Sequence, residues 1–166
     1  MAELDQLAEE VARRLTDRGE TVAVAESSAG GLISAALLGV AGASGYFKGG
    51  TVVYNADAKE RLAGMTRAEI DAGRSSTAPH TALLAAAIRR RLGSDWAIAE
   101  TGAAGPTGNR YGDAAGHVAL AVCGPVERTE VVETGQSGRR ANMDAFGAAA
   151  LRLLISAIDE APKPAK

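Results

Sequence analysis

Cysteine and histidine are scarce in this chain, which has Cys123 as its one cysteine and His80 and His117 as its two histidines. A single cysteine excludes an internal disulfide and a cysteine-based metal site. The histidines lie far apart and lack the His-x-x-x-His spacing of zinc sites, so we expect no metal centre. Cys123 ends the apolar stretch VALAVC, which is typical of a buried strand.

Neither sign of charge is in large excess, because 18 Lys and Arg residues stand against 20 Asp and Glu residues. The basic clusters are short, Arg89–Arg91 and the pair Arg139–Arg140, and they do not indicate a nucleic-acid partner. Arg89–Arg91 suit the solvated last turn of a helix, where cations interact favourably with the helix dipole.

Signals for export, membrane insertion and nucleotide binding are also missing. The first residues, MAELDQLAEE, are acidic and amphipathic rather than basic and then apolar, and no apolar run approaches membrane-spanning length. Neither a Walker A nor a G-x-G-x-x-G motif occurs. We therefore expect a cytoplasmic protein with no membrane partner and no cofactor.

Helical and strand patterns alternate along the chain. Apolar residues from Leu4 to Leu15 have helical spacing, and Gly19 ends that helix before a strand. The expected strands are 21–26, TVVY at 51–54, DWAIAE at 95–100, HVALAVC at 117–123 and ERTEVVET at 127–134, and a final helix is expected over 141–161. This order predicts an α/β fold, a three-layer α/β/α sandwich with a mixed, mostly parallel sheet.

Residues 1–161 are expected to form one domain, and the tail 162–166 is expected to be disordered. Helix starts are marked by Asn55, by the capping-box spacing of Thr66 and Glu69, and by Ser76 or Thr77. The long helix after Thr77 tolerates Pro79 in its first turn.

Polar residues follow three of the expected strands. Glu26-Ser27-Ser28 follow the first, Tyr54-Asn55 the second and Thr101-Gly102 the third, where a glycine-rich loop begins. Ligands of such folds bind at the carboxyl ends of strands, so these residues predict a pocket. Gly30 and Gly31 allow a tight turn there, which is also an ordinary role for glycine.

Ser27 and Lys59 together indicate acyl transfer. A serine at a strand end can attack a carbonyl if a base takes its proton, and a desolvated Lys59 could be that base, as in Ser-Lys variants of the catalytic triad. Tyr54 could relay or orient the proton. The alternative is that Ser27 is a turn residue, Lys59 a solvated lysine and Tyr54 a surface strand residue.

The stretch AESSAGGLISAALLGVAGASGYFKGGTVVYNADAK resembles the CinA carboxy-terminal domain family, the nicotinamide-nucleotide amidases. The pattern of that family runs Ala-Glu-Ser-Cys-Thr-Gly-Gly, then Gly-Ser-Ser, then Tyr-(Ser/Thr)-Asn-x-x-Lys. TGAAGPTG resembles the family's Thr-Gly-Ile-Ala-Gly-Pro-x-Gly, and GRSS and SGRR extend the similarity over nearly the whole chain. The resemblance implies hydrolysis of nicotinamide mononucleotide to nicotinate mononucleotide and ammonia, in pyridine-nucleotide salvage.

The resemblance also implies roles for particular residues. Ser27 matches the nucleophile, Lys59 the general base, Tyr54 the tyrosine beside it and Thr101 the threonine of the polar site. The residues expected at the substrate are Ser28, Gly30, Gly31, Asn55, Gly102, Gly105 and Arg140. Arg140 matches the arginine of a Gly-Asp-Arg element and is a candidate phosphate ligand, with a solvated first-turn arginine as the alternative. A homo-oligomer is usual for such proteins.

The chain departs from the family pattern around these residues. Ser28-Ala29 replace Cys-Thr, and Asp113-Ala114 stand where Lys-Pro is expected. Arg139 replaces an acid, and Asp144 an arginine. These departures leave open an amidase for another small carboxamide and a catalytically idle binding or regulatory domain.

Overall fold

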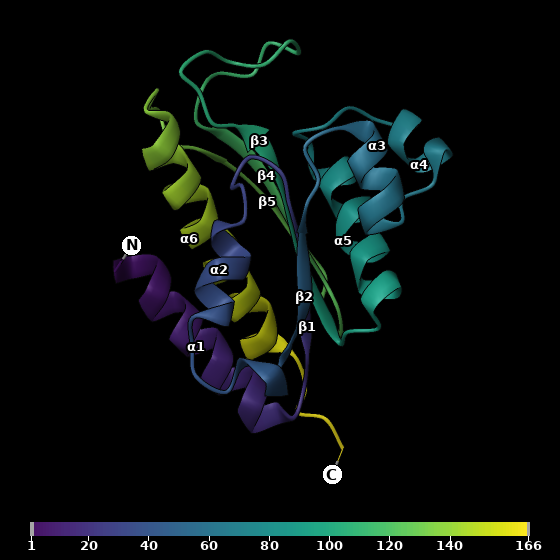
Figure 1. The fold of residues 1–166 in the computed structure, drawn as a ribbon, viewed down its shortest axis with the longest axis vertical. Coiled ribbons are helices and arrows are strands. Elements are labelled where there is room, and N and C mark those ends of the chain that lie inside the picture. The colour runs from purple at the N-terminus through teal and green to yellow at the C-terminus, as the bar shows by residue number, and fades with distance from the viewer. Residues whose placement is uncertain (1, 166) are drawn as a thin grey trace.

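The computed structural model describes residues 2–165, which form one five-stranded sheet between two layers of helices (Figure 1). The strands are β1 (Val22–Glu26), β2 (Phe47–Val52), β3 (Trp96–Ala103), β4 (His117–Cys123) and β5 (Arg128–Glu133). The longer helices are α1 (Ala2–Arg18), α2 (Leu32–Leu38), α5 (Ala78–Leu92) and α6 (Arg139–Glu160). The short ones are η1 (Ala43–Gly45), α3 (Ala56–Ala58), the π-helical turn η2 (Lys59–Ala63) and α4 (Arg67–Asp71).

The sheet has the order β2-β1-β3-β4-β5. β1 pairs in parallel with β2 and with β3, and β4 pairs antiparallel with β3 and β5, so only β4 runs against the rest. Helices α1, α2 and α6 cover one face and α3, α4 and α5 the other (Figure 1). The predicted α/β/α sandwich with a mixed, mostly parallel sheet is confirmed.

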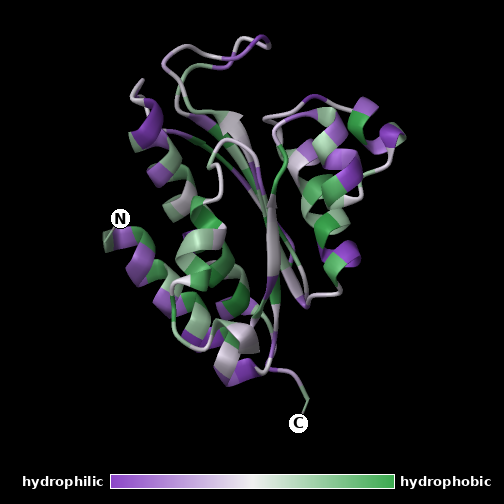
Figure 2. Ribbon diagram, in the orientation of Figure 1, coloured by the Kyte–Doolittle hydropathy of each residue, from purple (hydrophilic) through white to green (hydrophobic). Residues whose placement is uncertain are grey.

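Each face of the sheet has its own apolar core. Leu15, Trp96 and Phe146 belong to the core under α1, α2 and α6, and Leu84 and Ile88 to the core under α5. Figure 2 shows the apolar sides of the helices turned toward the sheet and the polar sides outward. The central strands β1 and β4 are buried along their whole length, which explains their nearly continuous apolar sequences.

The start of β2 differs from the prediction. The strand was expected at TVVY, but it begins at Phe47, within the glycine-containing stretch that reads as a connection. Parallel pairing of Phe47 with Val22 and of Val52 with Glu26 brings this stretch into the sheet. A Cβ atom at Gly50 would lie 2.1 Å from Ser34 Oγ, so glycine here lets α2 pack closely against the edge strand.

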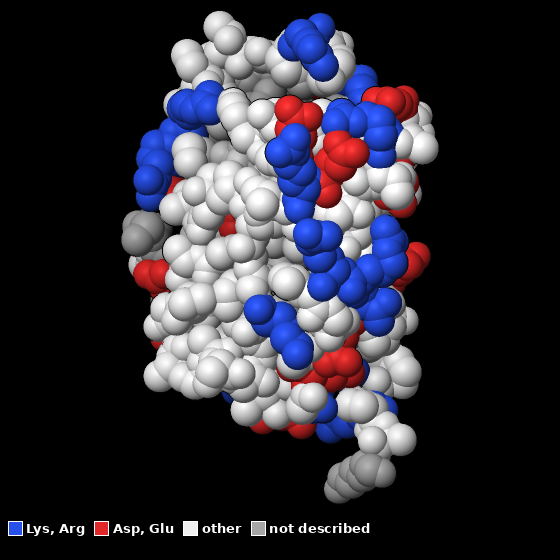
Figure 3. All heavy atoms as spheres, turned by 45° about the vertical axis from the view of Figure 1, so that its right-hand side comes forward, with Lys and Arg blue, Asp and Glu red and all other residues white. Residues whose placement is uncertain are grey.

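The helix starts predicted at Asn55 and Thr66 and the arginine cluster agree with the structure. Asn55 accepts a hydrogen bond from Ala58 N, and Thr66 and Glu69 form the capping box. The triplet Arg89–Arg91 forms the last turn of α5. Figure 3 shows Lys and Arg in a band interspersed with Asp and Glu.

The helix α6 is long and apolar enough to cross a membrane by length and composition, which the sequence patterns did not indicate. However, 56% of its most apolar stretch is buried against α1, α2 and the sheet, as expected of a core helix. After α6, residues 162–165 form no helix or strand, and Arg18 Nη2 donates a 2.7 Å hydrogen bond to Pro162 O. Disorder of the tail stays a prediction, and its last residue lies outside the described residues.

Candidate active site

A cavity of about 850 Å³ opens at the carboxyl ends of β1 and β3, beneath α3 and the loop before α5. Six of the residues expected from the sequence line it, namely Ser27, Tyr54, Asn55, Lys59, Thr101 and Gly102. The parallel strands β1, β2 and β3 end on this side, which is why residues distant in sequence meet here.

Lys59 is buried in this cavity with only 4% of its surface exposed. It begins the π-helical turn η2, which directs the side chain toward α5. The Lys59 ammonium nitrogen Nζ lies 2.6 Å from Ser75 Oγ and 2.9 Å from His80 Nε2. Burial lowers the pKa of Lys59 to about 8, although the negative charge of Glu100 opposes the shift. Lys59 is therefore not the solvated lysine of the alternative interpretation.

His80 lies beside Lys59 in the first turn of α5 and is 2% exposed. Burial and the neighbouring positive charge of Lys59 lower the pKa of His80 to about 4. The imidazole is therefore neutral near pH 7. Within residues 2–165 no group meets the Nδ1 atom of His80 in hydrogen-bond geometry. The Gly73 backbone favours the protonated ring and so opposes the lowering of the His80 pKa.

The turn that carries Ser27 is anchored by Glu100, a fully buried residue of β3. The Glu100 carboxylate accepts hydrogen bonds from Ser27 N at 3.0 Å, from Ala29 N at 2.8 Å and from the Ser28 hydroxyl. Burial raises the pKa of Glu100, and these donors oppose the rise. Within residues 2–165 the Ser28 N–H donates to no group.

Glu26 anchors the other side of this turn. Its carboxylate accepts hydrogen bonds from the backbone N–H groups of Gly31, Ile33 and Ser34 and from Ser34 Oγ, at 2.8–3.1 Å. The backbone at Gly30 and Gly31 has φ values of +68° and +103°, which glycine adopts without strain. Neither glycine lines the cavities around Ser27 and Arg139, so their structural role is in the turn.

Thr101 joins β3 to the loop before α5. Its hydroxyl oxygen Oγ1 accepts a 3.0 Å hydrogen bond from Ser76 N and lies 2.7 Å from Thr81 Oγ1. Ser76 is buried with φ +63°, an uncommon conformation for a residue with a side chain. The bond from Ser76 to Thr101 holds this backbone at the cavity wall, next to Ser75.

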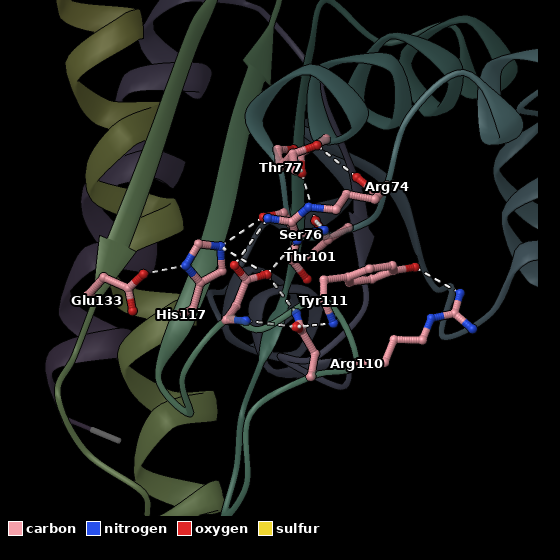
Figure 4. Close-up of polar contacts among 11 residues, drawn as sticks. Arg74, Ser76, Thr77, Thr101, Arg110, Tyr111, His117 and Glu133 are labelled. Atoms are coloured by element: carbon pink, nitrogen blue, oxygen red, sulfur yellow. Dashed lines mark hydrogen bonds and ion pairs between the residues drawn. The ribbon is translucent and has the colours of Figure 1, made fainter.

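His117 holds the same loop from the other side (Figure 4). Its Nε2 atom lies 2.8 Å from the Ser76 carbonyl oxygen, and its Nδ1 atom contacts the Glu133 carboxylate. Both partners are acceptors, so both ring nitrogens must carry protons and the ring is an imidazolium. Burial opposes this charge, but the bonds to Glu133 and Ser76 outweigh it and raise the pKa of His117.

Because the hydrogen bonds of His117 require a charged ring, the protein should become less stable at alkaline pH, where this ring loses its proton. Below about 6.5, the ordinary histidine pKa, the ring is charged whether folded or unfolded, and the stabilisation is complete. As pH rises through the higher pKa of the folded state, the stabilisation is lost. Urea unfolding of the wild type and of His117→Gln across this pH range gives the free energy of unfolding of each. The difference between the two values should become smaller as pH rises. An unchanged difference would contradict the assignment, because other groups titrate equally in both chains.

The loop between β3 and β4 forms the rim of the cavity (Figure 4). Arg74 makes a bidentate ion pair with Asp113 at 2.6 and 3.2 Å, which lowers the pKa of Asp113 to about 2. Tyr111 has the guanidinium of Arg74 at 5.1 Å and that of Arg110 at 5.0 Å from its ring centre. Asp113, which departs from the family pattern, therefore links this loop to the loop before α5 through its ion pair with Arg74.

Two expected residues, Tyr54 and Arg140, make contacts other than those predicted. The Tyr54 side chain is 67% exposed, and its hydroxyl accepts a 3.3 Å bond from Arg139 rather than contacting Ser27 or Lys59. Arg140 is outside the cavity, because its side chain points along α6 toward Asp144, 3.5 Å away. Arg139, which is itself exposed, donates a 2.7 Å hydrogen bond to Gly105 O. The helix α6 begins at Arg139, two residues earlier than predicted, so both arginines lie in its first turn.

A smaller cavity of about 280 Å³ adjoins the first and is lined by Ser28, Tyr54, Gly102, Gly105 and Arg139 among others. Gly102 and Gly105 are required by backbone packing. A Cβ atom at either position would lie 2.6 Å from a carbonyl oxygen, of His117 or of Ser137 respectively. The Ser28 hydroxyl is bonded to Glu100, so it anchors the turn.

Sequence reasoning missed Glu100, Ser75, His80 and His117 as site residues, and it assigned no role to Glu26 beyond its place at a polar strand end. A signal for the two glutamates was present, since the strands VAVAE and WAIAE both end in Ala-x-Ala-Glu. In the sheet, Ala23 to Glu26 pair in register with Ala97 to Glu100, which places the carboxylates side by side. No sequence spacing links His80 to Lys59, because their contact depends on how η2 packs against α5.

The described residues 2–165 contain no group of three or more His, Cys, Asp or Glu side chains that could hold a metal ion. The polar groups that line the cavity include hydroxyl groups, the Lys59 amine and the His80 imidazole. Ser27 Oγ and Lys59 Nζ line one cavity, but the structure places no hydrogen bond between them.

Comparisons with known proteins agree on one family. Residues 4–158 match the CinA C-terminal domain. A CinA-like protein of Thermosynechococcus vestitus is 39% identical over 141 residues, covering 83% of this chain and 34% of that protein. One of Anaeromyxobacter dehalogenans is 40% identical over 136 residues, covering 82% of this chain and 33% of that protein. The chain thus spans about a third of the length of these relatives.

Solved structures have the same fold. The competence damage-inducible protein A of Klebsiella pneumoniae superimposes with a TM-score of 0.88 at 26% identity, covering 95% of this chain and 98% of that one. The competence/damage inducible protein of Agrobacterium tumefaciens gives a TM-score of 0.87 at 29% identity, covering 95% of this chain and 96% of that one.

Proposed function

The chain belongs to the CinA C-terminal domain family, and on that premise we propose that it is an amidohydrolase that converts nicotinamide mononucleotide to nicotinate mononucleotide and ammonia. The observation that carries the proposal is the state of Lys59. It is a buried amine with a pKa of about 8, has no ion pair within residues 2–165, and shares a cavity with Ser27. Such an amine can accept a proton near neutral pH, which an ordinary lysine does poorly.

In the proposed reaction, Ser27 Oγ attacks the carboxamide carbon while neutral Lys59 takes the hydroxyl proton. The Ser28 N–H stabilises the oxyanion of the tetrahedral intermediate, as an N–H beside the nucleophile does in other serine hydrolases. Lys59 then gives its proton to the leaving nitrogen, and ammonia departs. Water attacks the acyl-serine with Lys59 again as base, which releases nicotinate mononucleotide and restores Ser27. Substrate binding is required to close the gap between the two side chains.

For the phosphate of the substrate we propose Arg139 in place of Arg140. The Arg139 guanidinium has no carboxylate partner within residues 2–165 and lies beside Gly105 and the Tyr54 hydroxyl. Its planar group can bind a phosphate with two parallel hydrogen bonds. Arg140, by contrast, is directed along α6 toward Asp144.

The adjacent arginines give a matched test of phosphate binding. Arg139→Ala should reduce the rate with nicotinamide mononucleotide by about 10- to 100-fold, because a charge-assisted hydrogen bond contributes about 1.5 to 3 kcal/mol. It should change the rate with nicotinamide riboside, which has no phosphate, much less. Arg140→Ala is the control and should leave both kcat/KM values near those of the wild type. Equal losses on both substrates for Arg139→Ala would reject this role.

A second candidate, ligand binding without turnover, is favoured by the missing hydrogen bond between Ser27 and Lys59. Ammonia release from nicotinamide mononucleotide, nicotinamide riboside and nicotinamide, measured in parallel with calorimetric binding, separates the candidates. Release with preference for the mononucleotide supports the proposal. Preference for another carboxamide points to a different amidase, and binding of the mononucleotide without release points to an idle domain. A cytoplasmic homo-oligomer acting in pyridine-nucleotide salvage completes the proposal.

A further inference from the structure

Lys59 is held in place by neutral groups. Its Nζ atom contacts the Ser75 hydroxyl at 2.6 Å and the His80 ring at 2.9 Å, and it forms no ion pair within residues 2–165. The negative charge of Glu100 on β3 raises the pKa of Lys59 without a direct contact between the two side chains. The other titratable or charged groups lining the cavity are Tyr54, Asp71, Arg74, Arg110 and Tyr111, and none lies within ion-pair or hydrogen-bond distance of Nζ.

The contact with His80 couples the protonation of the two side chains. A charged Lys59 can only donate to His80 Nε2, so the ring proton must then be on Nδ1. Nδ1 is buried, and within residues 2–165 the Gly73 backbone that acts on the ring does not meet Nδ1 in hydrogen-bond geometry, so a proton on Nδ1 is poorly paired, which is unfavourable. A neutral Lys59 can instead accept a hydrogen bond from Nε2–H, and the proton on Nδ1 is no longer needed.

We propose that His80 is a positioning residue that keeps Lys59 in its neutral, proton-accepting form by pairing its Nε2–H with the lysine amine. The pair has two arrangements, a charged lysine with the proton on His80 Nδ1 and a neutral lysine with the proton on Nε2. The pairing itself does not depend on the reaction, and its catalytic consequence rests on the proposed role of Lys59 as base.

The wild-type protein allows a direct test, because it has only four lysines and two histidines. Heteronuclear NMR can follow the Lys59 amine and the His80 ring nitrogens as pH is raised. The proposal requires the His80 proton to move from Nδ1 to Nε2 at the same midpoint at which Lys59 loses its proton. A His80 tautomer that stays constant through the titration of Lys59 would overturn it. This measurement requires no variant and no substrate.

A variant test adds a carboxylate in place of the imidazole. His80→Glu should raise the pKa of Lys59 by about 1 to 3, because an opposite charge within hydrogen-bond distance favours the ammonium. The rate falls at low pH because Lys59 becomes protonated, and this part of the profile of rate against pH should shift upward by the same number of pH units. At a pH below the Lys59 pKa, the rate should fall about tenfold for each unit of the shift. Pro79→Glu, which adds the same charge at the exposed neighbouring position, is the matched control and should leave the Lys59 titration unchanged.

The two proposals fail in different ways. A Lys59 pKa that is the same in His80→Glu and the wild type overturns the role of His80, whether or not ammonia is released. Coupled titration of His80 and Lys59 without ammonia release from any carboxamide supports the pairing and rejects the amidase. If His80→Glu does not fold, the wild-type NMR titration decides the question.

Discussion

Alanine at Ser27, at Lys59 or at both positions is expected to leave the same small residual rate of ammonia release. If Ser27 attacks and Lys59 takes its proton, each substitution removes a step that the other residue cannot perform, so the losses do not add. General-base catalysis by a positioned side chain contributes about 10²- to 10⁴-fold, and each single variant should lose at least that much. Initial rates for the wild type, both single variants and the double variant provide the measurement.

Two further variants make this test specific. Lys59→Arg should not restore activity, because a guanidinium stays protonated and cannot act as a base. Lys48→Ala removes an exposed lysine and should leave the rate unchanged. Circular dichroism should confirm that each variant is folded. A folded Lys59→Ala protein with near wild-type turnover would rule out the Ser-Lys mechanism, and mild, additive losses would favour the turn-residue interpretation of Ser27.

The largest expected effect on stability is at Glu26. Its two carboxylate oxygens accept four hydrogen bonds, and one of them, Oε2, accepts from both Ser34 N and Ser34 Oγ. Glu26→Gln replaces one acceptor oxygen with an NH₂ donor, which would face these donors in a fully buried site. With hydrogen bonds to charged groups contributing about 1.5 to 3 kcal/mol each, we expect a loss of at least about 3 kcal/mol.

Urea unfolding of Glu26→Gln and of a control checks this expectation. Glu130→Gln makes the same chemical change at an exposed position of β5 and should alter the free energy of unfolding by less than about 0.5 kcal/mol. Because Glu26 also holds the turn at Ser27, Glu26→Gln should lower kcat as well. A loss of stability no greater than that of Glu130→Gln would show that the turn is held mainly by its other contacts.

The sequence was sufficient to predict most elements because their signals are local. The apolar spacing of α1, the continuous apolar β4 and the caps at Asn55 and Thr66 depend on neighbours within a few residues. The alternation of helices and strands then predicted the layered fold, and the polar strand ends predicted the cavity. Ser27 and Lys59, which the residue types indicated as nucleophile and base and the family resemblance matched to those roles, both line that cavity.

Boundaries were less predictable where pairing between distant segments decides them. β2 begins at Phe47 because β1 pairs with it, although two glycines make its sequence resemble a turn. β3 continues to Ala103, beyond the predicted end at Glu100, because β4 pairs with it over that length. α6 begins two residues before its predicted start, and there Arg139 lines the smaller cavity while Arg140 points along the helix toward Asp144.

By itself the sequence determined the order of the elements, the two apolar cores and the strand ends at which the site lies, since these follow from periodicity and residue type. Only the tertiary structure decided the partners within the site. Glu100 holds the Ser27 turn across 73 positions of the chain, and His80 contacts Lys59 across 21. Such contacts depend on distances and burial created by packing η2 and α5 against the sheet, and no local pattern encodes them. The same burial lowers the pKa of Lys59, so its capacity to act as a base is a property of the folded chain.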